Sequence, residues 1–253
     1  MLIRELVDRF LFLVSVPKCV CCGKALDFED RCLCKSCRVN YEEHKTRNCS
    51  RCARTLKDCS CSNFYLECHS VRKMAKVYRY TTADTKTPGN SLIYSLKQDN
   101  RRDVFEFLSD ELAESIRRSL SITGREKHFL ITNVPRRAAS IREYGYDHAA
   151  ELARRISRKL GVEYSQLLVS RAKKAQKGMQ GEERIKNAIF DYKRGKERSL
   201  KGITVILVDD VVTTGASMGY CASLIRGMGT RRIVGATLSI AYKDSYAKPE
   251  YRY

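Results

Sequence analysis

Hydrophobic and polar positions along the chain alternate between short apolar runs and stretches with helical spacing. Apolar runs at 129–134, 162–169, 204–208 and 233–240 predict strands, and Val77, Tyr78 and Tyr80 predict an earlier one, which a polar loop at 81–90 follows. Apolar residues three or four positions apart predict helices between the strands: Phe105, Leu108, Leu112 and Ile116; Ala149, Leu152, Ala153, Ile156 and Leu160; and Cys221, Leu224, Ile225 and Met228. Alternating strands and helices predict an α/β fold with a parallel sheet covered by helices on both faces.

One segment joins a predicted buried strand to a predicted helix through polar residues. The strand at 204–208 ends in two adjacent carboxylates, Asp209 and Asp210. After Val211 and Val212 come small residues and hydroxyls, in the order Thr213, Thr214, Gly215, Ala216 and Ser217. Backbone N–H groups in such a turn close around a phosphate, and the N-terminus of the following helix favours negative charge. The segment therefore predicts an anion-binding turn beside a pair of acids.

The two carboxylates need a partner other than the phosphate, because they would repel it. A ribose 2′,3′-diol donates hydrogen bonds, so one ribose 5-phosphate satisfies both halves of the segment. The alternative, a buried strand running into an acidic helix cap, explains neither the paired acids nor the run of small residues. The stretch TVILVDDVVTTGAS resembles the phosphoribosyl pyrophosphate (PRPP) signature of type I phosphoribosyltransferases. That resemblance implies PRPP as the ligand.

Eleven of the twelve cysteines fall between Cys19 and Cys68, and eight of them form closely spaced pairs. Several such pairs in series are typical of zinc sites, whereas a redox motif needs a single pair. In the simplest assignment, two tetrahedral zinc ions are held by Cys19, Cys22, Cys34 and Cys37 and by Cys49, Cys52, Cys59 and Cys61. An interleaved assignment stays open, and any of Cys21, Cys32, Cys68, His44 and His69 could replace a ligand. We expect a structural role for the zinc first, and nucleic-acid binding, which basic residues on the same loops favour, second.

The charge of the chain is strongly positive. Its 253 residues contain 48 Lys and Arg against 29 Asp and Glu, a net charge of +19, while 43% hydrophobic residues suffice for a conventional core. An excess of this size predicts attraction to polyanions, with nucleic acid as the leading candidate. A ligand with several phosphates, together with a generally basic surface, is the alternative explanation.

Two further basic stretches have the chemistry to bind pyrophosphate. Arg136 and Arg137 follow the predicted strand at 129–134 in a turn, where two guanidinium groups suit a pyrophosphate, although a basic surface turn is the alternative. The polar segment at 170–192 is too long for an idle connection, so we interpret it as a lid. Its residues Arg171, Lys173, Lys174, Lys177 and Arg184 would neutralise the leaving group and exclude water. A solvated charged face is the alternative for this segment.

Together these stretches resemble the ComF family, which couples a double zinc ribbon to a type I phosphoribosyltransferase domain and is linked to bacterial natural competence. The likeness covers nearly the whole chain, including the cysteine pairs, YSLKQDNRR around Lys97, VPRRAASIREYGYDHAAELA, KAQKGMQGEERIKNAIF and VILVDDVVTTGAS. The sequence departs from the family pattern at Asn133, Tyr144, Asp147 and His148, where proline, arginine, asparagine and glutamine are usual.

The resemblance implies a type I phosphoribosyltransferase-like protein that binds PRPP with Mg²⁺ and contains two zinc ions. It also implies single-stranded DNA as a partner, a DNA-uptake helicase or other competence proteins as further partners, and a role in DNA uptake during natural transformation. As an enzyme, it would use Asp209, Asp210, Arg171, Lys177 and Arg184 while an acceptor attacks C1 of PRPP. Two alternatives stay open: a non-catalytic PRPP- or nucleotide-sensing protein that binds nucleic acid, and a nucleobase salvage phosphoribosyltransferase.

We expect three parts in the chain: an N-terminal helix at 1–17, a double zinc ribbon at 18–70 and the phosphoribosyltransferase-like domain at 71–253. The apolar run in the first part is too short to span a membrane. Acidic residues interrupt the first half of this part and no small-residue cleavage site follows, so a secretory signal is not expected. Reduced cysteines in metal spacing then favour a cytoplasmic location.

Overall fold

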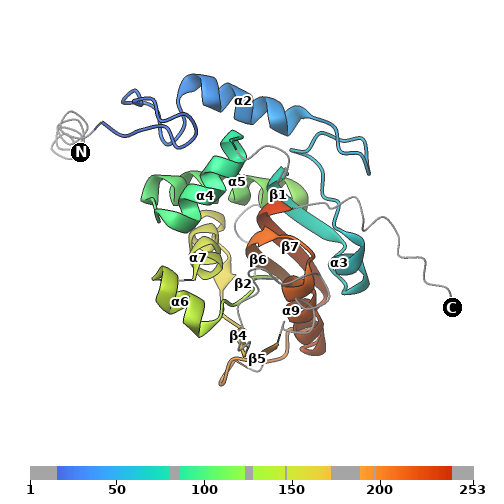
Figure 1. The fold of residues 1–253 in the computed structure, drawn as a ribbon. Helices are drawn as coiled ribbons and strands as arrows, with labels where there is room; N and C mark the ends of the chain where they lie inside the picture. Colours follow the sequence, from blue (N-terminus) through green and yellow to red (C-terminus); the bar gives the residue numbers. More distant parts are fainter. Residues whose placement is uncertain are drawn as a thin grey trace.

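A five-stranded parallel sheet forms the centre of the molecule (Figure 1). The structure is a computed structural model and describes residues 16–79, 86–122, 128–145, 147–171, 189–196 and 198–240. Across the sheet the strands follow the order β1 (Lys73–Arg79), β7 (Arg232–Ile240), β6 (Thr204–Val212), β2 (Phe129–Asn133) and β3 (Glu163–Tyr164). The sheet confirms the predicted parallel α/β fold.

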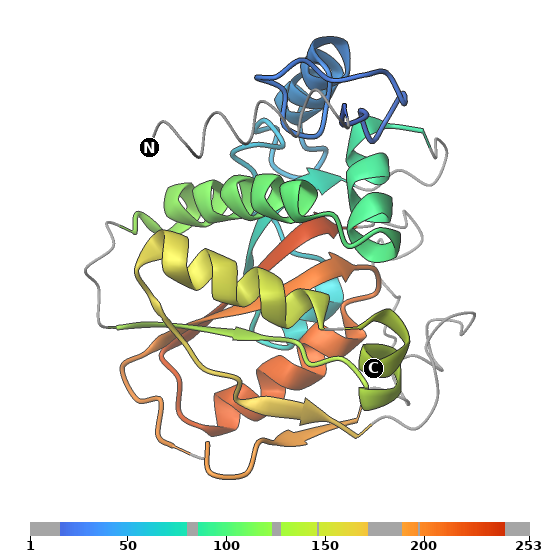
Figure 2. The same cartoon turned by 90° about the vertical axis from the view of Figure 1, so that its left-hand side faces the viewer.

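Helices cover both faces of this sheet (Figure 2). On one face lie α5 (Arg102–Leu120) and α7 (His148–Leu160), and on the other lies α9 (Ala216–Gly227). Successive side chains of a strand point to opposite faces, so β6 contributes Ile206 to the core under α5 and α7 and Leu207 to the core under α9. The helices on the two sides therefore bury their apolar stripes against opposite faces of the same strands.

The chain connections diverge between β2 and β6. From β2 the chain passes through α6 (Ala138–Tyr144) and α7 to β3, away from β6, whereas α9 takes the chain from β6 to β7 on the opposite side. Ligands of open parallel sheets bind outside the carboxyl ends of the strands where the connections diverge in this way. The predicted anion-binding turn follows β6 and so lies at this point.

The region before β1 contains two similar loops. An isolated antiparallel bridge joins Lys18 to Ala25 in the first loop, and a matching bridge joins Asn48 to Thr55 in the second. The helix α2 (Lys35–Thr46) lies between them. This arrangement agrees with the doubled pattern of cysteine pairs in the sequence.

Both loops are packed against the α/β sheet and its helices. Buried residues of the first loop, among them Leu26 and Cys32, belong to the same hydrophobic core as α5. The helix α2 contacts α4 (Pro88–Gln98), and the short helix α3 (Phe64–Cys68), which follows the second loop, contacts α9. The cysteine-rich region therefore touches the α/β fold on both faces of its sheet.

Three predicted boundaries differ from the structure. The predicted strand at 162–169 is two short strands, because the chain leaves the sheet after β3 and its second part, β4 (Leu168–Ser170), pairs with β5 (Phe190–Tyr192) in a separate antiparallel ribbon. The predicted polar loop at 81–90 already contains the start of α4, and β6 extends beyond its predicted end at 208. The last difference places both acids inside the strand.

The predicted N-terminal helix at 1–17 falls almost entirely outside the described residues. Among the helices that the structure does describe, none combines the length and the apolar character that crossing a bilayer requires.

Candidate functional site

A cavity of about 420 Å³ opens at the carboxyl ends of β2 and β6. It brings together, in one place, every residue that the sequence predicted to bind the sugar phosphate: Asp209, Asp210, Val211, Thr213, Thr214, Gly215, Ala216, Ser217, Arg136 and Arg137. Lys97 from α4 and Phe190 from β5 also line it. The acids, the phosphate turn and the two guanidinium groups therefore surround one volume.

The two carboxylates lie near the end of β6 and leave the strand in different directions, as successive side chains do. The backbone N–H of Asp210 donates to Asp209 Oδ1 at 2.9 Å, and the N–H of Val211 donates to Asp210 Oδ1 at 2.7 Å. Asp210 Oδ2 also forms ion pairs with Arg136 Nη2 at 3.0 Å and with Lys97 Nζ at 3.5 Å. Each acid is thus held in place by contacts within the protein.

The pKa values of the two acids move in opposite directions. Burial raises the pKa of Asp209 well above its ordinary value, and the negative charge of Asp210 raises it further. Burial also acts to raise the pKa of Asp210, but the positive charges of Lys97 and Arg136 outweigh it and lower that pKa to about 2. At neutral pH Asp210 is therefore an ionised acceptor, while Asp209 retains its proton more readily than an ordinary aspartate.

Arg136 is held by hydrogen bonds at both its backbone and its side chain. Its backbone N–H donates to Asp147 Oδ2 at 3.0 Å, and its Nη1 donates to His148 Nδ1 at 2.8 Å. Because arginine only donates, Nδ1 accepts, so the proton of neutral His148 is on Nε2, which donates to Asn100 Oδ1 at 3.0 Å. Burial and the nearby charge of Arg136 lower the pKa of His148, which keeps this tautomer neutral. The guanidinium is consequently oriented toward Asp210.

The turn after β6 requires glycine where α9 begins. Gly215 is the N-cap of α9 and has a left-handed φ of 86°, which a residue with a side chain rarely adopts. A Cβ at this position would also lie 2.7 Å from Leu66 Cγ of α3. The turn is therefore shaped for glycine by its backbone angle and by the helix packed beneath it.

Asn63 supports the same turn from outside the cavity. Its Nδ2 donates to the backbone carbonyl of Thr214 at 3.2 Å, while its Oδ1 accepts the N–H of Leu66 at 2.9 Å and caps α3. The chain segment after the second cysteine loop is thus joined directly to the predicted phosphate turn.

The predicted lid residues are placed only in part. Arg171 is exposed, and its Nη2 pairs with Asp191 Oδ2 at 3.3 Å, so its side chain lies outside the lining of the cavity. Lys177 and Arg184 fall outside the described residues, and so do Lys173 and Lys174. The lid remains a prediction from the sequence.

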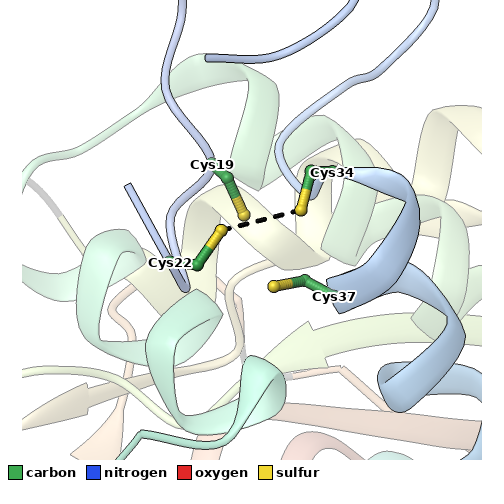
Figure 3. A group of neighbouring side chains, drawn as sticks. All are labelled: Cys19, Cys22, Cys34 and Cys37. Atoms are coloured by element: carbon green, nitrogen blue, oxygen red, sulfur yellow. Dashed lines mark hydrogen bonds between the residues drawn. The ribbon is translucent and has the colours of Figure 1, made fainter. Parts of the chain in front are cut away.

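The cysteine pairs converge in the sequential order (Figure 3). The sulfur atoms of Cys19, Cys22, Cys34 and Cys37 lie within 4.8 Å of one another, and the figure shows the four side chains pointing toward a common centre. A second group with the same property contains Cys49, Cys52, Cys59 and Cys61. Four thiolates at this separation fit one tetrahedral zinc ion with Zn–S bonds of about 2.3 Å, so each group can hold one ion. The donors present therefore suit zinc at both places.

The cysteines and histidines considered as replacement ligands lie outside both groups. The Sγ of Cys21 donates to the carbonyl of Lys86 at 3.5 Å, His44 stacks on Tyr78 and His69 stacks on Tyr65. No disulfide joins any of the twelve cysteines, all of which lie in the described part of the chain.

A buried lysine joins the second cysteine group to the sheet. Lys76 of β1 is only 4% exposed, and its Nζ donates to the carbonyl oxygens of Cys59 and Cys61, both at 2.9 Å. A buried ammonium needs such acceptors, and its positive charge also suits a site of four thiolates. The second group is therefore fixed to the first strand of the sheet by a side chain.

Sequence reasoning did not place three contributors to the site. Lys97 stands in a stretch that resembles the family, but no spacing signal in the sequence points it toward Asp210. His148 stands out in the sequence only as a departure from the family pattern. Asn63 had no signal at all, because its contact with Thr214 spans 151 positions of the chain.

Comparisons with known proteins agree with this geometry. A family model described as "Phosphoribosyl transferase domain" matches residues 147–253. The chain is 24% identical over 208 residues to a protein of Bacillus subtilis (strain 168) named "Competence protein ComFC". The aligned region covers 79% of this chain and 80% of that protein. It is also 24% identical over 238 residues to the "Competence protein ComFC" of Streptococcus pneumoniae (strain ATCC BAA-255 / R6), covering 85% of this chain and 96% of that one.

Proposed function

The chain belongs to the ComF family, and from this premise we propose that it binds PRPP with Mg²⁺ in the cavity between β2 and β6 and acts in DNA uptake during natural transformation. It is a competence-related protein with a phosphoribosyltransferase-like domain. The division of the chain at about residue 70 and the cytoplasmic location stay predictions from the sequence.

The observation that carries the proposal is the single cavity shared by Asp209, Asp210 and the turn at 213–217. A ribose diol donates hydrogen bonds to carboxylates, and a 5-phosphate accepts them from the backbone N–H groups at the start of α9. One ribose 5-phosphate therefore satisfies both groups, whereas inorganic phosphate alone would leave the acids unused.

The pyrophosphate of PRPP would bind Arg136 and Arg137. Both line the same cavity, and guanidinium groups bind pyrophosphate oxygens with charge-assisted hydrogen bonds. A Mg²⁺ ion bound together with PRPP would supply further positive charge beside the pyrophosphate. Arg136 also pairs with Asp210, so binding of the pyrophosphate would draw this guanidinium away from the acid.

Two of the departures from the family pattern, Asp147 and His148, contact Arg136 directly, and a third, Asn133, lies at the end of β2. Asp147 accepts the backbone N–H of Arg136, and His148 accepts from its guanidinium. Asn133 is fully buried, and its Oδ1 accepts the hydroxyl hydrogen of Tyr164 at 2.8 Å. These residues make hydrogen bonds that keep the loop after β2 in place, which supports a working pyrophosphate end of the site.

Single-stranded DNA is the proposed macromolecular partner. The net charge of +19 favours a polyanion, and the two relatives are named as competence proteins. Two zinc ions at the cysteine groups would fix the loops that carry basic residues of this region. A DNA-uptake helicase or other competence proteins are proposed as further partners on the family likeness alone.

The test is incubation with PRPP and Mg²⁺ across a panel of nucleobases and single-stranded oligonucleotides, following pyrophosphate release. In the proposed reaction an acceptor nitrogen or oxygen bonds to C1, the C1–O bond breaks, its electron pair leaves with pyrophosphate, and the acceptor proton passes to solvent. Release that depends on one acceptor and disappears in Asp210→Asn supports a transferase. PRPP binding without release favours the sensor alternative, and failure of PRPP to bind contradicts the proposal.

A further inference from the structure

Positive side chains gather at the edge of the sheet that lies opposite the cavity. The cavity opens where the parallel strands end, so this second edge is where they begin, on the left of Figure 2. Exposed cations lie at this edge and at the neighbouring end of α9, and we call them the amino-edge surface: Arg72, Lys73, Lys201, Arg226, Arg231 and Arg232. The cavity makes no use of any of them.

Strand pairing between β6 and β7 brings the first cations of this surface together. Arg232, the first residue of β7, lies opposite Thr204, the first residue of β6. The backbone N–H of Arg231 donates to the carbonyl of Ile203 at 2.8 Å. Lys201 comes two residues before Ile203 in the same turn. Because neighbouring strands lie about 4.8 Å apart, these three cations begin adjacent strands side by side.

The strand β1 and the helix α9 extend the amino-edge surface. Lys73 is the first residue of β1, which pairs with β7, and Arg72 directly precedes it. At the end of α9 the carbonyl of Met228 accepts the N–H of Leu200 at 2.8 Å, which brings the last turn of the helix, with Arg226, to the start of β6. The surface therefore runs across three neighbouring strands and the end of one helix.

The charge of this surface is not balanced by the protein around it. None of its cations forms an ion pair with another described residue. At the described amino ends of the five strands the only acid is Glu163 of β3, and Arg198 already pairs with it at 2.9 Å. A cation in the last turn of a helix stabilises that helix, which accounts for Arg226 but not for the others. Unbalanced like charges repel one another, so their grouping indicates an anionic partner.

The side chains of this surface favour phosphates over other anions and over a membrane. Most are arginines, whose guanidinium groups bind phosphate oxygens through two parallel hydrogen bonds. Exposed large hydrophobic side chains, such as Phe28, Val39 and Tyr94, lie on other parts of the chain, so the surface has no apolar anchor for a bilayer and no ring on which a base could stack. Resting on the function proposed above, we propose that the amino-edge surface binds the sugar–phosphate backbone of single-stranded nucleic acid, whatever its sequence.

This placement separates the nucleic acid from the cavity. Asp209 lies five residues beyond Thr204 in β6, a distance of about 16 Å at about 3.3 Å per residue. A strand held at the amino edge can therefore bind while the cavity holds PRPP. Its contacts there hold the nucleic acid without placing a base beside the ribose.

The test titrates the full-length protein against a fluorescein-labelled oligothymidylate and follows anisotropy at several salt concentrations. The edge variant is Arg231→Gln with Arg232→Gln. The control, Lys24→Gln with Arg102→Gln, removes the same charge from exposed positions on the first cysteine loop and at the start of α5. The edge variant should bind about tenfold more weakly and lose about 1.4 from the salt slope, since each lost phosphate contact contributes about 0.7. The control should bind within about twofold of the wild type.

The second cysteine loop is the rival location for the strand. Arg54→Gln with Lys57→Gln removes two exposed cations from that loop. A larger loss of affinity in this loop variant than in the edge variant would place the strand on the loop and overturn the proposal. Equal losses in the edge variant and the control would mean that total charge alone governs binding, which also overturns it, as does a wild type that does not bind the oligonucleotide.

A membrane is the other polyanionic surface that cations could bind. Sedimentation with vesicles that contain phosphatidylserine tests this on the same proteins. The edge variant is expected to lose affinity for the oligonucleotide. If it loses affinity for the vesicles and binds the oligonucleotide like the wild type, the surface serves a membrane and the proposal is wrong.

Calorimetry with PRPP and Mg²⁺ separates this inference from the proposed function. The edge variant should bind PRPP within about twofold of the wild type, because neither arginine lines the cavity. Saturating PRPP should likewise leave the affinity for the oligonucleotide unchanged within about twofold. Loss of PRPP binding in the edge variant, or competition between PRPP and the oligonucleotide, would contradict a separate surface. If PRPP fails to bind the wild type, the anisotropy titration still decides whether the amino edge binds the strand.

Discussion

Asn63 Nδ2 donates a hydrogen bond to the backbone carbonyl of Thr214 at 3.2 Å. The same side chain caps α3 through its Oδ1, and α3 packs under Gly215 and α9. Asn63 directly follows the second group of four cysteines. The predicted phosphate turn is therefore supported by the cysteine-rich region as well as by the sheet.

Replacing Asn63 with alanine is expected to weaken the binding of ribose 5-phosphate about tenfold, because the carbonyl of Thr214 loses a donor and the turn loses its support. The lost cap of α3 should also lower the free energy of unfolding by about 1 kcal/mol. Calorimetry and urea unfolding measure the two effects. The control is Asn40→Ala on the exposed face of α2. Equal affinity of Asn63→Ala and Asn40→Ala would show that the contact does not position the turn.

The stability of the protein should depend on pH through His148. Its pKa in the folded protein lies below the ordinary value, first because of burial and then because of Arg136, so the unfolded chain takes up the proton first as the pH falls. The charges that face it are those of Arg136, Lys97 and Asp210. The contribution of neutral His148 to the free energy of unfolding is therefore complete above about pH 6.5. Below that pH it decreases, by up to about 1.4 kcal/mol per pH unit.

His148→Gln should remove this part of the pH dependence, because glutamine can accept from Arg136 through its carbonyl oxygen but does not titrate. Urea unfolding at several pH values between neutral and moderately acid measures the difference between variant and wild type. Identical pH dependence in the two proteins would mean that His148 does not change its protonation on unfolding.

Each group of four cysteines is expected to hold one zinc ion, so elemental analysis of the wild type should find about two per chain. Cys52→Ser should reduce this to about one and lower the melting temperature, because the second loop has little apolar core of its own. Cys68→Ser is the control, since Cys68 is exposed and lies outside both groups. Loss of an ion from Cys68→Ser, or two ions in Cys52→Ser, would contradict the assignment.

Affinity for single-stranded DNA should fall steeply as salt increases. Each phosphate contact releases counterions and contributes about −0.7 to the slope of log affinity against log salt for a single strand. Fluorescence anisotropy with a labelled oligonucleotide measures the slope, and a strand with an uncharged methylphosphonate backbone is the matched control. A flat response for the natural strand would exclude the electrostatic partnership that the net charge of +19 predicts.

Local sequence patterns predicted the strand, the paired acids, the turn and the helix at 204–227, because all four depend on neighbouring residues. The error in this stretch was the end of β6, which continues to Val212 because it pairs with β7 up to Ile240. Pairing between distant strands therefore set a boundary that the local pattern placed earlier.

Two other elements show different limits of predicting structure from the sequence. The helix α4 had a readable signal, since Thr87 accepts the N–H of Asn90 as a side-chain cap and Pro88 occupies the first turn, but the polar composition favoured a loop. The predicted strand at 162–169 had no such signal for its division. It divides because Ser165 bonds back to Ile131 in β2, after which the chain joins β5 in another sheet. That choice depends on a tertiary contact.

The central claim is that Asp209 and Asp210 hold the sugar of PRPP, and calorimetry with PRPP and Mg²⁺ tests it most directly. The wild type should bind, and the double variant Asp209→Asn with Asp210→Asn should lose at least about a hundredfold in affinity, as the loss of two hydrogen bonds to the ribose hydroxyls predicts. The control Asp191→Asn removes an exposed carboxylate outside the cavity and should bind like the wild type. Unchanged affinity in the double variant, or no binding by the wild type, would contradict the account.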